Sequence, residues 1–174
     1  FVNKEINFYM IEDSLLTFEK ILLSNPLMAT VKLARFKFVS KMLDKNDRII
    51  DVGCGGGLST FYYSNFCCKA LGIDNDSRRK KEWCSHKSKK LDFIHLDAKS
   101  LNEIKFDANC IINVDFIEHI SKKEGINFIK DCKRYLENQT NNRNKMLIIG
   151  TPSHYSKKYR AKHNLRHHKY EYKP

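Results

Sequence analysis

The stretch from Ile49 to Gly57, IIDVGCGGG, constrains the fold of this chain more than any other feature. Its short apolar run predicts a buried strand, and this run ends in an acidic residue and a glycine-rich turn. Glycines let a backbone approach a ligand closely, because they carry no side chain and tolerate positive φ angles. The stretch therefore predicts a turn that binds a nucleotide-like ligand at the carboxyl end of a parallel strand.

A second apolar segment supplies the partner of this turn, and it ends in Leu71-Gly72-Ile73-Asp74. A carboxylate at the end of the strand that follows a glycine turn can accept hydrogen bonds from both ribose hydroxyls. We therefore expect Asp74, with Asn75 beside it, to bind the sugar of the ligand.

The glycine spacing separates possible cofactors. A dinucleotide site requires G-x-G-x-x-G, but Leu58 occupies the last position, and the pattern is G-x-G-x-G over Gly53, Gly55 and Gly57. The turn has no Gly-Lys-Ser/Thr, which excludes a P-loop, and no Lys or Arg to meet a phosphate. Asp51, just before the turn, suits a cationic ligand better than a pyrophosphate. The alternative is a glycine-rich turn in another kind of α/β domain.

On these residues, the segment from Asp47 to Thr151 resembles the class I S-adenosylmethionine (SAM)-dependent methyltransferases. The resemblance implies SAM as cofactor and the ribose role for Asp74. It also implies that Asp51 forms the floor of a loop shaped by Gly53, Cys54, Gly55 and Gly57.

Strands and helices alternate along the chain, which predicts an α/β fold with a Rossmann-like, doubly wound, mostly parallel sheet in a three-layer sandwich. We expect one methyltransferase domain over 1–174, with N-terminal helices in 1–45, a SAM-binding core in 46–151 and a basic substrate-side tail in 152–174. The family fold carries a C-terminal hairpin that this tail lacks, so we expect the tail to be atypical or cut short. The expected strands are 48–52, 69–74, 92–96, 108–114 and 146–150; the expected helices are 15–23, 31–42, 58–66, 77–88 and 122–136.

The third expected strand is followed by Asp97-Ala98. In the family that the chain resembles, the acidic residue here binds the adenine amino group, and Ala98 would offer its backbone N–H. The alternative is that Asp97 caps a helical turn over 99–103.

The fourth expected strand runs into Asn113-Val114-Asp115-Phe116-Ile117-Glu118-His119. This resembles the family motif E-x-x-E-H, with Asp115 in place of the first Glu. In part of the family these residues and a later His, here His168, bind Mg²⁺ or another divalent metal. A helical turn would bring Asp115, Glu118 and His119 to one face. Alternatively, Asp115 holds the methionine end of the cofactor or the loop backbone, Glu118 begins a helix, and His119 contacts the substrate or is a general base. We also expect Asn113 to contact the cofactor.

Two resemblances suggest different acceptors. Gly150-Thr151-Pro152-Ser153 is similar to G-T-P-N of ubiquinone-biosynthesis-type O-methyltransferases, which implies O-methylation of a small hydroxylated metabolite. The segment 165–172 is similar to the tail of small-RNA 2′-O-methyltransferases, which implies RNA as the alternative acceptor. The segment from Asn113 to Phe116 lacks both prolines of the motif that nucleic-acid base N-methyltransferases carry after this strand, which argues against base N-methylation. A third alternative is a SAM-binding module without catalysis. In the preferred interpretation, His119 and Glu118 are the catalytic residues.

Composition sets outer limits on partners and environment. The formal net charge of +12 over 174 residues favours an anionic partner, and the dense basic stretch 157–169 could contact RNA, an acidic substrate or a membrane surface, or be solvated. The six cysteines form no C-x-x-C pair and indicate buried, reduced thiols in a cytoplasmic protein. The sequence shows no signal peptide and no apolar run of membrane length.

Overall fold

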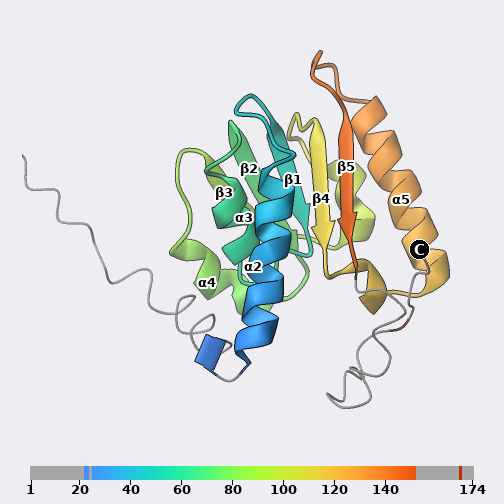
Figure 1. Cartoon of the computed structure of the whole chain (residues 1–174). Coiled ribbons are helices and arrows are strands. Elements are labelled where there is room, and N and C mark those ends of the chain that lie inside the picture. The colour runs from blue at the N-terminus through green and yellow to red at the C-terminus, as the bar shows by residue number, and fades with distance from the viewer. Residues whose placement is uncertain (1–21, 24, 152–168, 170–174) are drawn as a thin grey trace, which may run out of the picture.

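A five-stranded parallel sheet in the order β3-β2-β1-β4-β5 forms the centre of the molecule (Figure 1). The structure is a computed structural model that describes residues 22–23, 25–151 and 169. The order places the first strand in the middle, so the chain crosses over the sheet in both directions, as in a doubly wound fold. The strands are β1 (Arg48–Val52), β2 (Lys69–Asp74), β3 (Leu91–His95), β4 (Cys110–Val114) and β5 (Met146–Gly150).

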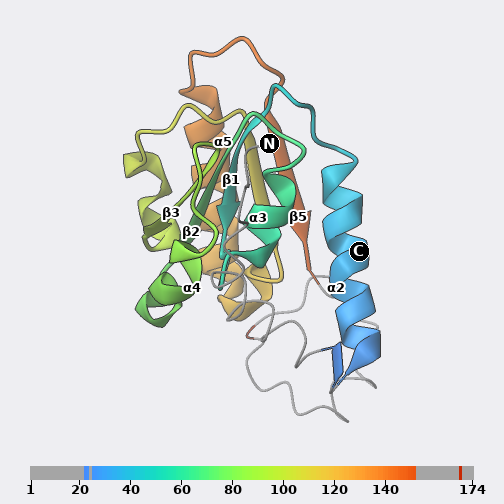
Figure 2. The ribbon, with the colours of Figure 1, turned by 90° about the vertical axis from the view of Figure 1, so that its left-hand side faces the viewer.

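Helices cover both faces of the sheet, and the view turned by 90° shows α2 and α5 on opposite sides of it (Figure 2). One face packs against α2 (Pro26–Ser40), α3 (Leu58–Tyr63) and α4 (Lys80–Cys84). The other face packs against η3 (Ala98–Glu103), η4 (Ile117–His119) and α5 (Lys122–Glu137). A short turn, η2 (Ser77–Arg79), precedes α4.

Alternation along each strand divides the apolar core between the two layers of helices. In β1, Ile49 contributes to the core beneath α2 and α3, and Ile50 contributes to the core beneath α5. Both side chains are buried, because a parallel sheet covered on both faces exposes neither. The predicted three-layer α/β/α architecture is confirmed.

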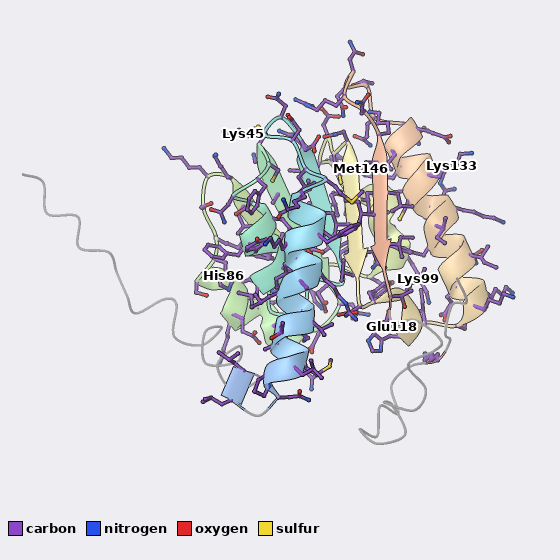
Figure 3. All side chains as sticks on the ribbon, in the orientation of Figure 1. Lys45, His86, Lys99, Glu118, Lys133 and Met146 are labelled. Carbon is purple, nitrogen blue, oxygen red and sulfur yellow. The ribbon has the colours of Figure 1, made fainter. Side chains whose placement is uncertain are left out.

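The carboxyl ends of the parallel strands meet at one edge of the sheet. Figure 3 places Glu118 at this edge and Lys45, which precedes β1, at the opposite one. The polar loop 138–145 lies at the same end as Lys45, away from the carboxyl ends (Figure 1). The predicted ligand site therefore lies at the edge that Glu118 marks.

Three predicted strands have the observed bounds, whereas β3 begins and ends one residue earlier than predicted and β4 begins at Cys110. The helix predicted from residue 31 begins at Pro26, because Asn25 caps it by accepting from the Met28 N–H at 3.2 Å. The helix predicted over 77–88 is instead the turn η2 followed by the short helix α4. Most of the first predicted helix and nearly all of the tail lie outside the described residues.

The cysteines agree only in part with the prediction of buried, reduced thiols. All six are free thiols, but Cys68 and Cys84 are exposed rather than buried. Cys68 lies in the loop before β2, and Cys84 is the last residue of α4. In the described part of the chain, no helix has the length and apolarity needed to cross a bilayer.

Candidate functional site

The turn between β1 and α3 follows a path that glycine makes easy. Gly53, Gly55 and Gly57 have φ angles of 76°, 54° and 89°, all in the region that L side chains rarely adopt. The Gly53 and Cys54 N–H groups donate to Ile73 O at 2.9 and 3.1 Å, which ties the turn to the end of β2. The backbone therefore bends sharply at the carboxyl edge of the sheet.

Close packing also restricts this turn. A Cβ on Gly53 would lie 2.8 Å from the Phe116 side chain, and one on Gly57 would lie 2.6 Å from the Phe93 ring. Nothing lies within 4 Å of the position that a Cβ on Gly55 would take. Two of the three glycines are thus required by space as well as by backbone angle.

Trp83 of α4 supports the turn from one side. Its indole N–H donates to Gly55 O at 2.7 Å, and its ring stacks on Phe93 with centroids 5.7 Å apart. The sequence analysis did not single out this residue, although the sequence contains one tryptophan. A buried indole N–H requires an acceptor, and this requirement is a signal that could have identified Trp83.

Asp51 supports the turn from below. It is buried, and its Oδ2 accepts from the hydroxyls of Ser59 and Thr60 at 2.7 Å each. Burial raises the pKa of this carboxyl to about 6, against the lowering effect of the two hydroxyls. Asp51 thus anchors the first turn of α3 beneath the glycine turn.

Asp74 lies where the sequence predicts the ribose carboxylate, at the end of β2. Its Oδ2 accepts from Gly55 N and its Oδ1 accepts from Asp76 N, both at 2.8 Å. These bonds orient the carboxylate, and a carboxylate oxygen can accept more than one hydrogen bond. The same group therefore braces the glycine turn and faces the pocket.

A pocket of about 370 Å³ opens between the ends of β1, β2, β3 and β4. Its lining brings together six residues that the sequence analysis named, and adds Phe116, Lys99 and Lys169 among others. The size fits a nucleoside-sized ligand. The six are Gly53, Asp74, Asn75, Asp97, Ala98 and His119.

Asp97 shows the geometry of the capping alternative and also lines the pocket. Its Oδ1 accepts from Lys99 N at 2.9 Å, and η3 follows directly. The adenine role stays a prediction, which this capping bond does not prevent, since the other carboxylate oxygen is not used by it.

Two residues that the sequence analysis named are buried and do not line the pocket. Cys54 is buried, and burial raises the pKa of its thiol well above the usual range. Asn113 is also buried; its Nδ2 donates to Val52 O at 3.0 Å, so it links β4 to β1. Neither lines the pocket, and their predicted contact with the cofactor stays a prediction.

The three members of the D-x-x-E-H segment point in separate directions. Asp115 has a φ of 59° at the end of β4, and its carboxylate forms an ion pair with Arg35 of α2. Glu118 is buried, and its Oε2 accepts from the Thr151 hydroxyl at 3.2 Å. His119 is exposed and lines the pocket. A left-handed residue and one 3₁₀ turn replace the predicted helical face, so the three do not converge.

The metal prediction therefore lacks its expected geometry. Among the described residues, no three His, Cys, Asp or Glu side chains form a group that could hold a metal ion. His168, the predicted fourth ligand, lies outside the described residues. Its neighbour Lys169 is described, and the Lys169 N–H donates to Glu118 O at 2.8 Å, which places Lys169 at the site.

Burial raises the pKa of the Glu118 carboxyl, and the nearby charge of Asp115 adds to the increase.

The sequence analysis missed Arg35, because its partner, Asp115, is 80 positions away in the chain. No local pattern indicates a contact of that separation.

Comparisons with known proteins identify the family of this chain. Residues 49–139, just over half of the chain, match the family model described as a methyltransferase domain. No curated protein matches the sequence.

Among solved structures, small RNA methyltransferase HEN1 has a TM-score of 0.64 and 16% identity over 82% of this chain. A DhpI–SAM–HEP complex has a TM-score of 0.58 and 12% identity over 89% of this chain and 71% of that one. A chain of the Pnkp1/Rnl/Hen1 RNA repair complex has a TM-score of 0.57 and 20% identity over 80% of this chain. This chain spans 20% of the HEN1 chain and 31% of the repair-complex chain. At these identities the likeness is one of fold.

Proposed function

Since this chain belongs to the methyltransferase-domain family and is a class I SAM-dependent methyltransferase, we propose that it transfers the methyl group of SAM to a hydroxyl oxygen of a small metabolite. The observation that carries this proposal is the pocket at the carboxyl edge of the sheet, where the glycine turn and Asp74 face the same cavity. A sulfonium cofactor with a ribose suits a site that has carboxylates and no phosphate-binding cation in its turn.

In this proposal, different residues of the pocket bind different parts of the cofactor. Asp74 accepts hydrogen bonds from the ribose hydroxyls, with Asn75 beside it. Asp97 and the Ala98 N–H hold the adenine, and Gly53 lets the backbone approach the methionine end. All five residues line the pocket, which supports this assignment of roles.

The acceptor side lies at the ends of β4 and β5. When bound, SAM supplies a methyl group on a positively charged sulfur, which is already a good leaving group. The acceptor oxygen would gain the methyl carbon, and the electron pair of the broken carbon–sulfur bond would stay on the cofactor sulfur. His119, which lines the pocket, accepts the hydroxyl proton in this proposal.

Glu118 has a positioning role in the same proposal. Its side chain is 1% exposed and accepts from Thr151, so it fixes the residue after β5 against η4. This arrangement sets the direction of the neighbouring His119.

RNA ribose is the second candidate acceptor. The net charge of +12 favours it, and a small RNA methyltransferase shares the fold of this chain. The 165–172 segment resembles the tail of that class of enzyme, and Lys169 lines the pocket. The two candidates differ in how binding responds to salt, because contacts to phosphates release counterions.

The first experiment tests the cofactor. SAM is titrated calorimetrically into the wild type and into Asp74→Ala, with Asp44→Ala as the matched control on a carboxylate at the opposite end of the sheet. Binding to the wild type and the control that is lost in Asp74→Ala supports the proposal. A folded wild-type protein that binds no SAM contradicts it and favours a degenerate module.

The second experiment separates the acceptors. Catechols and short RNAs are incubated with methyl-labelled SAM at low and high salt. Labelled catechol with little dependence on salt supports the small-metabolite proposal. Labelled RNA that depends on an intact terminal ribose diol, with affinity that falls steeply with salt, would favour the second candidate.

A further inference from the structure

A second cavity, of about 170 Å³ and here called the side cavity, adjoins the pocket at the carboxyl edge of the sheet. It lies between η3 and α5, and six of its nine lining residues also line the pocket, so the two cavities meet. The shared residues are Asp97, Ala98, Lys99, Phe116, Ile120 and Glu124. The side cavity adds Asn127, Phe128 and Asp131, all from α5.

The inner wall of the side cavity is apolar. Phe116 and Phe128 meet edge to face with ring centroids 5.6 Å apart, and Phe128 is buried. Ala98 and Ile120 pack against the same core beneath α5. An apolar cavity of about 150 Å³ is large enough to bind benzene. The size and the inner wall of the side cavity therefore suit one small apolar ring.

The carboxylates at the rim of the side cavity already have partners. Glu124 accepts from the Ser121 N–H at 3.0 Å and pairs with Lys99 at 3.2 Å, and Asp131 pairs with Arg134 at 2.6 Å. These charges are balanced, so a neutral group suits the cavity better than a cation. The Lys99 side chain is 72% exposed, so moving it aside costs little free energy.

Asp97 connects the side cavity with the cofactor. In the proposed function it binds the adenine amino group, N6, and it lines both cavities. One oxygen accepts from the Lys99 N–H, which leaves the other for N6. A secondary amine at N6 keeps one N–H for that oxygen, and its substituent lies at the boundary between the two cavities. The space beyond the adenine edge is therefore open to a group attached at N6.

We propose that the side cavity is a subsite for a substituent on the adenine N6, so that the enzyme binds adenosyl ligands that carry one small apolar ring there, such as a benzyl group. The ring lies against Phe116 and Phe128, while Asp97 keeps its hydrogen bond and Asp74 keeps the ribose. Burial of the ring offsets the entropy lost in ordering it. This inference rests on the proposed function, because it extends the range of ligands for the same site.

The test compares S-adenosylhomocysteine with its N6-benzyl derivative by calorimetric titration. The proteins are the wild type, Asn127→Phe, Asp131→Phe and the control Lys133→Phe, an exposed residue of α5 that lines neither cavity. We expect the wild type to bind the two ligands within about threefold of each other. Asn127→Phe and Asp131→Phe each keep the parent affinity and weaken the benzyl derivative about tenfold or more, because the new ring fills the space. The control changes neither affinity.

Three results would overturn the inference. The wild type could bind the parent ligand and reject the benzyl derivative. Both filling variants could keep the benzyl affinity, which would place the ring elsewhere. A folded filling variant could lose the parent ligand, which would show that adenine itself occupies the side cavity. Asn127 and Asp131 lie one turn apart, so either variant decides the test if the other does not fold. A wild type that binds neither ligand would instead overturn the proposed function.

Discussion

Individual residues of the glycine turn differ in what prevents a side chain there. Gly57 combines a φ of 89° with a Cβ position 2.6 Å from the Phe93 ring, whereas Gly55 has a φ of 54° and open space. Backbone strain affects both positions, and steric overlap affects only Gly57 among these two.

We expect Gly57→Ala to lower the free energy of unfolding by about 2–4 kcal/mol, because strain and overpacking add. Gly55→Ala should lower it by only about 1 kcal/mol, from the backbone alone. Urea unfolding of the two variants beside the wild type measures the difference. Equal losses would contradict the steric argument.

Asp51 makes stability depend on pH in a direction that follows from its pKa. Its folded-state pKa is about 6, above the ordinary value of 3.8, so the folded protein binds the proton more tightly than the unfolded chain. Its contribution to stability is full below about pH 3.8 and is lost as the pH rises through 6.

In Asp51→Asn this dependence disappears. Relative to the variant, the wild type should lose about 2.4 kcal/mol of unfolding free energy between pH 4 and pH 8. Urea unfolding of both proteins across this range measures the change. A difference between the two that stays constant with pH would show that Asp51 has no raised pKa.

His119 tests the proposed proton transfer. We expect His119→Gln to lower kcat by about 10²–10⁴-fold, the usual contribution of a general base, with SAM affinity unchanged. Single-turnover rates and calorimetry on the same preparation separate chemistry from binding. A variant that binds SAM and keeps its rate would assign the proton to another group.

At the scale of elements, the helices beside the carboxyl edge support the glycine turn and the pocket. α4 contributes Trp83, and α5 begins with a capping box in which Ser121 and Glu124 satisfy each other's backbone N–H groups. Glu124 also pairs with Lys99 at 3.2 Å, and both residues line the pocket. The walls of the pocket are thus made by helix ends as well as by strand ends.

Trp83→Phe isolates the contribution of α4. Phenylalanine keeps the ring stack on Phe93 but cannot donate to Gly55 O. We expect SAM affinity to fall about fivefold, which corresponds to one neutral hydrogen bond of about 1 kcal/mol. Calorimetry measures the affinity, and Phe93→Leu, which keeps the indole donor, is the matched control. Unchanged affinity in Trp83→Phe would limit Trp83 to packing.

For the whole molecule, ligand binding and folding are linked. A ligand that binds only the folded state at 100 times its Kd adds about 2.7 kcal/mol to stability. For a chain of 174 residues we expect SAM at that excess to raise Tm by roughly 5–10 °C. Thermal unfolding with and without SAM measures the shift. The same concentration should leave the Tm of Asp74→Ala unchanged, and an equal shift in that variant would contradict the ribose role.

Much of the fold followed from local patterns. Apolar runs of strand length, separated by amphipathic segments, predicted all five strands and the sandwich, and three strands have the predicted bounds. The glycine spacing and Asp74 predicted the pocket, because strand ends in a parallel sheet share one edge. The predicted start of α2 was wrong because a helix cap decides it: the helix begins at Pro26, after the capping residue Asn25.

The sequence by itself determined the order of elements, the glycine turn and the family, since these depend on neighbours in the chain. Only the tertiary structure decided the directions of Asp115, Glu118 and His119. A left-handed residue and a single 3₁₀ turn separate them, and the partner of Asp115 comes from a helix 80 positions earlier. Side-chain direction depends on backbone angles and on distant partners, and neither is encoded in spacing alone.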